Sequence, residues 1–222
     1  MIRAAMLLAR NDLRLERRFP QLTLAMALFS GVALTLFHFA AAVKNPPLVV
    51  LVGLLAVTLM LAALLAVSRV FSAERDDGLL DALLLSPISR VSIWLGKAFV
   101  IGALLLVTEV VALPLFWLFF VDTLSVYRAT PQPAFGRVAL ALLVADIGLA
   151  ALGAIVAIMA TATRGRDVLV PVLFLPSCIP LLIGTIGIAR GGALLQPLQL
   201  VLLYDAFVIA VAYGVCEHVL TE

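Results

Sequence analysis

Three carboxyl side chains of this sequence, those of Glu109, Asp146 and Asp205, fall inside long apolar stretches. A charged side chain at the centre of a bilayer costs about 3 kcal/mol on insertion scales, so such residues usually face the interior of a membrane protein. Because no Lys or Arg lies within these stretches, we expect the desolvated carboxyls to be protonated and to donate hydrogen bonds. Two interpretations follow: a proton or cation site, or interhelical hydrogen bonds that hold a helix bundle together.

A charged segment between two apolar stretches forms a second candidate site. Leucines follow the charges, Gly78 permits a bend, and Pro87 disfavours helix in the residue before it. We therefore expect a short amphipathic helix and turn over residues 71–90. It is either an interfacial helix with a solvated charged face or an element that a soluble partner pushes, moving the helices on both sides. The charged residues are Glu74, Arg75, Asp76, Asp77 and Asp81.

The fifth apolar stretch contains three prolines in close succession, Pro171, Pro176 and Pro180. Each proline removes a backbone donor from a helix. Carbonyls freed in this way inside a membrane must find partners in neighbouring side chains or in water. The pattern predicts a kinked helix, which is either mobile or simply bent.

Catalytic and cofactor motifs are missing from the sequence. It has no P-loop pattern G-x-x-x-x-G-K-[ST], no H-E-x-x-H, no G-x-S-x-G and no Cys/His cluster. We therefore expect no enzymatic activity and no directly bound cofactor or metal, so energy for transport has to come from a partner or an ion. His38, His218 and Tyr204 are candidate haem ligands, but a single His on an apolar helix is more often a packed side chain. Cys178 and Cys216 are expected to be buried free thiols.

The composition indicates which elements carry these residues. Hydrophobic residues make up 64% of the 222 residues and charged residues 13%, against ~45–50% and ~25% in an ordinary globular domain. No soluble fold of this size can bury so much apolar surface, which excludes a soluble enzyme, a disordered chain and a nucleic-acid-binding domain. Since a spanning helix needs about 20 apolar residues, we predict an all-α membrane protein with a single transmembrane domain over residues 1–222. The six predicted spans are approximately 21–43, 48–68, 98–120, 138–163, 168–189 and 198–219.

The distribution of basic residues predicts the orientation. Of the 15 Lys and Arg residues, eleven lie in the N-terminal segment, in the loop between the second and third spans, or in the loop between the fourth and fifth. By the positive-inside rule, both termini are expected in the cytoplasm. With a rise of ~1.5 Å per residue, Glu109 and Asp146 then lie at nearly the same depth, and Asp205 lies closer to the outer face.

Residues 2–18 form a separate amphipathic pattern. Ile2, Met6, Ala9 and Leu13 recur at helical spacing beside a stripe of arginines. The pattern predicts a basic helix on the cytoplasmic leaflet, where anionic lipids attract arginine. This helix serves either as a topology anchor or as a docking or elbow element.

Two stretches of the sequence resemble known membrane proteins. The segment Phe71–Arg90, followed by Gly96 and Lys97, resembles the cytoplasmic element of type-2 ABC permeases, with its Glu-Arg pair, glycine, leucines, proline and Ser-Arg. The run from Arg164 to Pro180 is similar to the fifth-span signature of the CcmB, or haem exporter protein B, family of cytochrome c maturation. The chain length and the six predicted spans also match that family.

The resemblance assigns roles to two sets of positions. The ATPase-coupling element of the family corresponds to Glu74, Arg75, Asp77, Gly78, Asp81 and Pro87, and the fifth-span signature corresponds to Arg166, Asp167, Pro171, Pro176 and Pro180. Glu109 and Asp146 depart from the family pattern, which has a mostly uncharged third span and a small or hydroxyl residue in the fourth. A role for the buried acids therefore does not follow from the resemblance.

The resemblance implies a permease subunit in the bacterial inner membrane, present in two copies. Its expected partners are a separate ATP-binding subunit (CcmA-like), CcmC-like and CcmD-like membrane proteins, and a CcmE-like haem chaperone. ATP is bound by the partner and haem is the candidate substrate of the complex. The permease would couple ATP hydrolysis to haem export or to release of the haem-loaded chaperone.

Two alternatives to the haem pathway remain at this point. A type-2 ABC exporter of a drug, lipid or polysaccharide would share the 71–90 segment but would not need the fifth-span signature. A proton-coupled secondary transporter would depend on Glu109 or Asp146 and usually shows internal repeats. The two halves of the sequence show no clear repeat.

Overall fold

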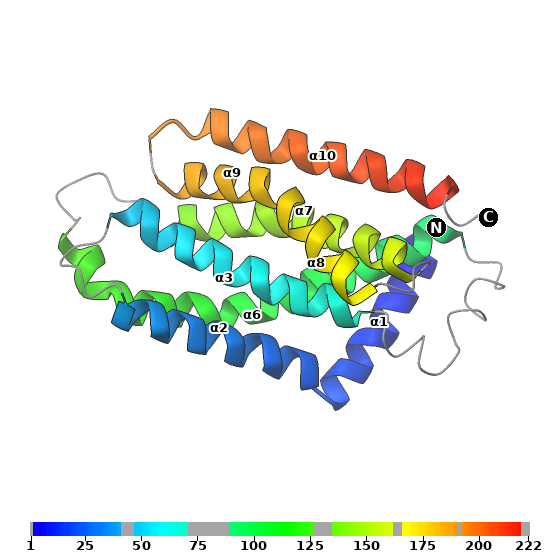
Figure 1. Ribbon diagram of the computed structural model, residues 1–222, viewed down its shortest axis with the longest axis horizontal. Coiled ribbons are helices and arrows are strands. Elements are labelled where there is room, and N and C mark those ends of the chain that lie inside the picture. Colours follow the sequence, from blue (N-terminus) through cyan, green and yellow to red (C-terminus); the bar gives the residue numbers. More distant parts are fainter. Residues whose placement is uncertain are drawn as a thin grey trace.

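The computed structural model describes residues 2–40, 47–70, 89–126, 135–161, 166–190 and 192–218, and within these ranges it contains eight helices and no strand (Figure 1). The all-helical prediction is therefore confirmed for the described residues. The 71–88 part of the predicted coupling segment lies outside them. The helices are α1 (Ile2–Arg18), α2 (Gln21–Ala40), α3 (Leu48–Arg69), α6 (Arg90–Val126), α7 (Phe135–Thr161), α8 (Arg166–Ser177), α9 (Ile179–Ala189) and α10 (Leu195–His218).

Five of the described helices are long and apolar enough to cross a membrane: α2, α3, α6, α7 and α10. The pair α8 and α9 passes the same test only as a unit, because the two helices meet at an angle of 41° at a short break. The described chain thus has five candidate spans, or six if the bent pair is one span. The kink predicted from the prolines is confirmed by this bend.

The helix of the third predicted span is longer than its apolar stretch. We predicted a span over residues 98–120, whereas α6 runs from Arg90 to Val126. At its start, Ser89 occupies the N-cap position and its hydroxyl lies 2.6 Å from that of Ser92. Pro114 lies inside the helix without ending it, which transmembrane helices tolerate when their surroundings satisfy the freed backbone groups.

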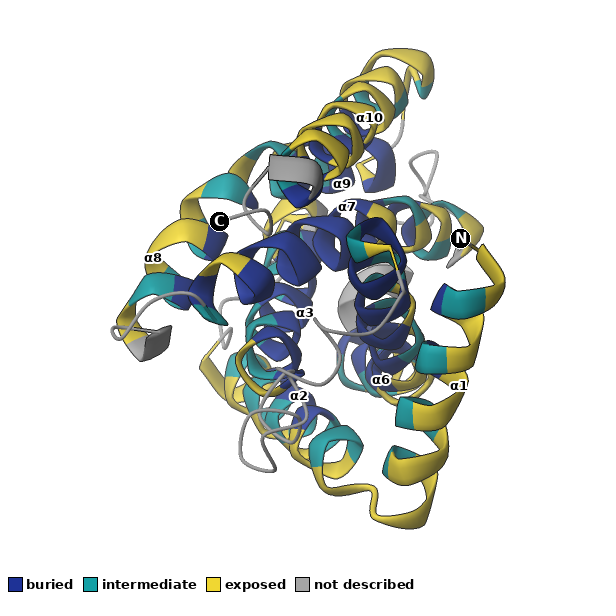
Figure 2. Ribbon diagram, turned by 90° about the vertical axis from the view of Figure 1, so that its right-hand side faces the viewer, coloured by how far each residue is buried: buried dark blue, intermediate teal, exposed yellow. Residues whose placement is uncertain are grey.

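Helix α7 occupies the centre of the bundle. Within the apolar 18-residue stretch of each candidate span, 78% of the residues of α7 are buried, compared with 17% for α2 and 22% for α10 at the periphery. Figure 2 shows the buried residues gathered on α7 and on the inner faces of α3 and α6. Small residues such as Ala145, Ala151 and Ala154 are fully or almost fully buried on α7, and they let the backbones of the surrounding helices approach closely.

Both described ends of the chain lie at the same end of the bundle, which we call the termini end (Figure 1). It also holds the last turn of α3 and the first turn of α6 (Figure 1). Helix α1 lies across this end and packs against α6. The predicted helix over residues 2–18 is therefore confirmed, and it is joined to the bundle as well as carrying an exposed apolar face.

Candidate functional site

The three acids singled out in the sequence all point into the protein. Glu109 on α6, Asp146 on α7 and Asp205 on α10 are each 3–5% exposed. One oxygen of Glu109, one of Asp146 and both of Asp205 have no hydrogen-bond partner among the described residues. Burying a polar group without a hydrogen-bond partner destabilises a fold, so each of these four oxygens marks a place where a further hydrogen-bond or ion-pair partner would stabilise the protein.

The acids divide into two locations. The carboxyls of Glu109 and Asp146 lie close enough to repel each other when charged, in agreement with the equal depth expected from the sequence. Asp205 instead packs against α7 at Gly148, where an added Cβ would overlap its Oδ1 and lie 2.8 Å from Leu181 Cδ2. Glycine is therefore the residue that leaves room for the Asp205 carboxyl between α7, α9 and α10.

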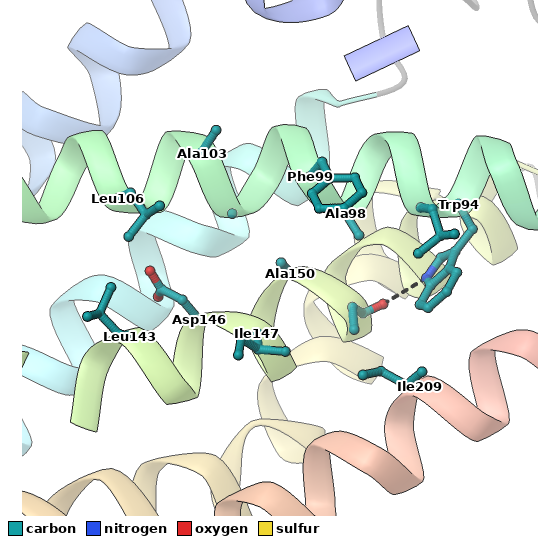
Figure 3. A pocket seen from close by; sticks show the side chains of 13 residues that line it. Trp94, Ala98, Phe99, Ala103, Leu106, Leu143, Asp146, Ile147, Ala150 and Ile209 are labelled. Carbon is teal, nitrogen blue, oxygen red and sulfur yellow. Dashed lines mark hydrogen bonds between the residues drawn. The ribbon is translucent and has the colours of Figure 1, made fainter. Parts of the chain in front are cut away.

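A cavity of about 450 Å³ lies on α7 between α6 and α10, and we call it the α6–α10 groove (Figure 3). Its walls include Trp94, Phe99 and Leu106 on α6, Asp146 and Ile147 on α7, and Ile209 on α10. Asp146 is the only ionisable residue among those that line it. At one end Trp94 Nε1 donates a 3.1 Å hydrogen bond to the carbonyl of Ala151, which joins α6 to α7.

The break in the fifth span has a specific partner on α10. The hydroxyl of Tyr204 donates a hydrogen bond to the carbonyl oxygen of Ser177, the last residue of α8. Pro176 lies inside α8, and Pro180 stands in the first turn of α9. From its sequence position Tyr204 is expected only as a haem ligand, and this contact is not predicted, although the carbonyls freed by the prolines need hydrogen-bond donors nearby.

Among the remaining candidate ligands, His38 is an exposed side chain in contact with an aromatic ring, and the side chain of His218 lies outside the part of the chain that the structure describes. The ring of His38 stacks on Phe119 with 5.4 Å between centroids. Cys178 and Cys216 are buried and free, as predicted. Within the described ranges, no group of three or more His, Cys, Asp or Glu side chains could hold a metal ion.

A polar junction at the termini end connects three helices. Lys97 Nζ lies 2.9 Å from Asp12 Oδ2 on α1 and donates a 3.1 Å hydrogen bond to the carbonyl of Val70 at the end of α3. Beside it, a Cβ on Gly96 would lie 3.1 Å from the carbonyl oxygen of Ala5, so α1 sits directly on the α6 backbone. We call Asp12, Val70, Gly96 and Lys97 the α1–α6 junction.

The residues assigned through the family resemblance are only partly described. The six coupling residues Glu74, Arg75, Asp77, Gly78, Asp81 and Pro87 lie outside the described ranges. Arg166 and Asp167 are the first two residues of α8. The α1–α6 junction flanks the undescribed 71–88 segment, because Val70 immediately precedes it and Lys97 lies two turns after it.

Comparisons with known proteins give a consistent result. The family described as "CcmB protein" matches residues 3–216 of the chain. The "Heme exporter protein B" of Rhodobacter capsulatus is 31% identical over 141 residues, an alignment that spans 64% of this chain and 61% of the relative. No solved structure matches the chain. Because the family match covers nearly the whole sequence, this multi-span membrane protein belongs to the CcmB family.

Proposed function

We propose that this chain is the transmembrane permease subunit of an ABC complex that handles haem during c-type cytochrome biogenesis in the bacterial inner membrane. The observation that carries the proposal is the CcmB family match over residues 3–216. The heme exporter name of the Rhodobacter relative agrees with it. Energy comes from ATP hydrolysed by a separate CcmA-like subunit, and the chain transmits that energy to haem export or to release of a haem-loaded CcmE-like chaperone.

The proposed topology has six spans, with α8 and α9 as one broken span and both termini in the cytoplasm. An even number of spans agrees with the position of the two described chain ends at the same end of the bundle. The excess of Lys and Arg in the segments at that end supports the cytoplasmic assignment. A soluble ATPase would then approach the termini end.

Coupling is proposed to run through the 71–90 segment and the α1–α6 junction. The segment connects α3 to α6, and Lys97 contacts the α3 carbonyl of Val70 and the α1 carboxyl of Asp12 at the same time. A displacement of the segment by the ATPase would therefore act on α1, α3 and α6 together. Two copies of the chain, with CcmC-like and CcmD-like membrane proteins, complete the proposed complex.

A haem stain for covalently bound c-type cytochromes tests the function. A strain that lacks the gene is complemented with the wild-type chain or with a Glu74→Ala, Asp77→Ala double variant. We expect no stained bands in the deletion strain, full rescue by the wild type, and failure of the double variant at equal membrane levels. A matched control is Arg190→Ala, which removes an exposed charge at the opposite end of the bundle and should rescue.

Two results would contradict parts of the proposal. Normal cytochrome bands in the deletion strain would overturn the haem-pathway function as a whole. Full rescue by the expressed double variant would leave the pathway in place but remove Glu74 and Asp77 from coupling. Co-purification of the chain with an ATPase that has no membrane spans separates an ABC permease from an ion-driven transporter.

A further inference from the structure

The α6–α10 groove is long and lined mainly by apolar side chains, as a binding site for an elongated apolar ligand would be. From Trp94 to Leu106 its α6 wall is about 18 Å long at 1.5 Å rise per residue. Its volume of about 450 Å³ is ample for several large side chains. Phe99 and Ile147, from facing walls, are 51% and 52% exposed, so the groove opens sideways between α6 and α10 (Figure 3).

The groove contains one buried acid, which has no counter-charge among the residues that the structure describes. Asp146 is 5% exposed, lines the groove, and has an oxygen with no hydrogen-bond partner among the described residues. Along α7, Arg137 is about 14 Å away at 1.5 Å per residue. Lys97 on α6 is already paired with Asp12. The neighbouring ionisable group, Glu109, is itself an acid, so Asp146 has no cationic partner among the described residues.

The depth of Asp146 in the membrane distinguishes three possible occupants of the groove: a lipid, a second copy of this chain, and a helix of another membrane protein. A lipid keeps its polar headgroup at the membrane interface, whereas Asp146 lies about 14 Å along α7 from Arg137, near the middle of a 30 Å hydrocarbon core. A second copy of this chain has no Lys or Arg within any predicted span. A helix from another membrane protein can fill the apolar walls and carry a basic side chain to this depth, because polar residues join helices inside membranes.

We propose that the α6–α10 groove binds one transmembrane helix of a partner membrane protein, and that a Lys or Arg near the middle of that helix pairs with Asp146. Apolar side chains of the partner helix fill the groove beside Phe99, Leu106 and Ile147. Asp205 takes no part, because it is enclosed against Gly148 between α7, α9 and α10.

Synthetic transmembrane peptides test this site on the full-length chain. The chain carries Trp117→Phe, which leaves Trp94 in the groove as the sole tryptophan, and is reconstituted in phosphatidylcholine vesicles. Dansyl-labelled polyleucine peptides with either Lys or Leu at the central position are titrated in, and energy transfer from Trp94 is measured. We expect the Lys peptide to half-saturate at an about tenfold lower peptide-to-lipid ratio than the Leu peptide.

Matched variants separate pairing with Asp146 from general helix association. Asp146→Asn should remove the preference for Lys, and Asp205→Asn, an equally buried acid outside the groove, should retain it. Ala103→Phe, which adds a large ring to the wall of the groove, should weaken the binding of both peptides. If the two buried cysteines of the Asp146→Asn variant react with a thiol reagent, the variant is unfolded. In that case the binding of the peptides to Ala103→Phe decides whether they occupy the groove.

Several outcomes would overturn the proposal. Equal binding of the two peptides to the wild-type chain, or unchanged binding of the Lys peptide to Ala103→Phe, would do so directly. Saturable quenching of Trp94 by brominated phosphatidylcholine that the Lys peptide does not relieve would assign the groove to lipid. Displacement of the Lys peptide by unlabelled copies of the chain would assign it to a second copy.

Discussion

The contact between Gly148 and Asp205 makes a quantitative prediction about the packing of α10 on α7. A Cβ at position 148 would overlap Asp205 Oδ1 and approach Leu181. Overpacking of this kind typically costs about 1–3 kcal/mol, while replacing a helical Gly by Ala returns about 1 kcal/mol of helix propensity. We therefore expect Gly148→Ala to lower the free energy of unfolding by about 1 kcal/mol, equivalent to a Tm lower by about 2–4 °C.

The matched control is Gly102→Ala on α6. There the added Cβ would meet Ala150 Cβ at 3.6 Å, an ordinary van der Waals distance. Because this substitution adds no steric clash, only the higher helix propensity of Ala should act, and it should raise Tm by about 2–4 °C. Thermal unfolding in detergent can be followed with a thiol-reactive fluorescent probe, since Cys178 and Cys216 are both buried and free and should react only when the bundle opens.

A double-mutant cycle identifies the clashing partner. In an Asp205→Ala background, Gly148→Ala no longer meets the carboxyl, so its penalty should shrink or change sign. The expected interaction energy is about 1–2 kcal/mol, within the range for contacting residues. Strict additivity of the two substitutions would refute the placement of Asp205 over Gly148. A higher Tm for Gly148→Ala alone would refute the close approach itself.

Three further predictions concern other contacts in the bundle. Tyr204→Phe removes the donor to the Ser177 carbonyl and should lower the free energy of unfolding by about 1–3 kcal/mol, measured by thiol reactivity. Tyr213→Phe, 47% exposed on the same helix, should change it by less than about 0.5 kcal/mol. Trp94→Phe removes the hydrogen bond to Ala151 together with ring volume and should cost about 2 kcal/mol in the same assay. Gly96→Leu should displace α1 from α6, because a side chain at this position meets the α1 backbone, and tryptic cleavage of α1 should become about tenfold faster or more. Unchanged cleavage would argue against the packing of α1 on α6.

The sequence predicted the helices and the inward direction of the acids because both depend on local chemistry. An apolar stretch of about 20 residues has few alternatives to a spanning helix, and a carboxyl within it is driven away from lipid. Glu109, Asp146 and Asp205 accordingly all lie in the interior. The ends of α6 were less predictable, because polar residues such as Lys97 can remain helical when a partner is available.

The contacts between distant residues could not be predicted from the pattern alone. The partner of Lys97 is Asp12, 85 positions earlier in the sequence, and nothing local indicates which acid a buried lysine meets. Tyr204 and Ser177 are likewise 27 positions apart. Such pairs are set by how the helices cross, which depends on the fit of many apolar side chains at once.

The distribution of polar contacts suggests how a force would travel through the bundle. At the termini end, Lys97 joins α6 to α1 and α3, and Trp94 joins α6 to α7. Deeper in the bundle, α7, α9 and α10 pack closely at two glycines instead: Gly148 of α7 lies against Asp205 of α10, and Gly184 of α9 lies against Val201 of α10. Directional hydrogen bonds resist sliding, whereas small shifts between packed helices are a common form of conformational change. We therefore expect a push on the 71–90 segment to move the helices that these hydrogen bonds connect, α1, α3, α6 and α7, together, and the packing of α9 and α10 at Gly148 and Gly184 to accommodate the resulting displacement.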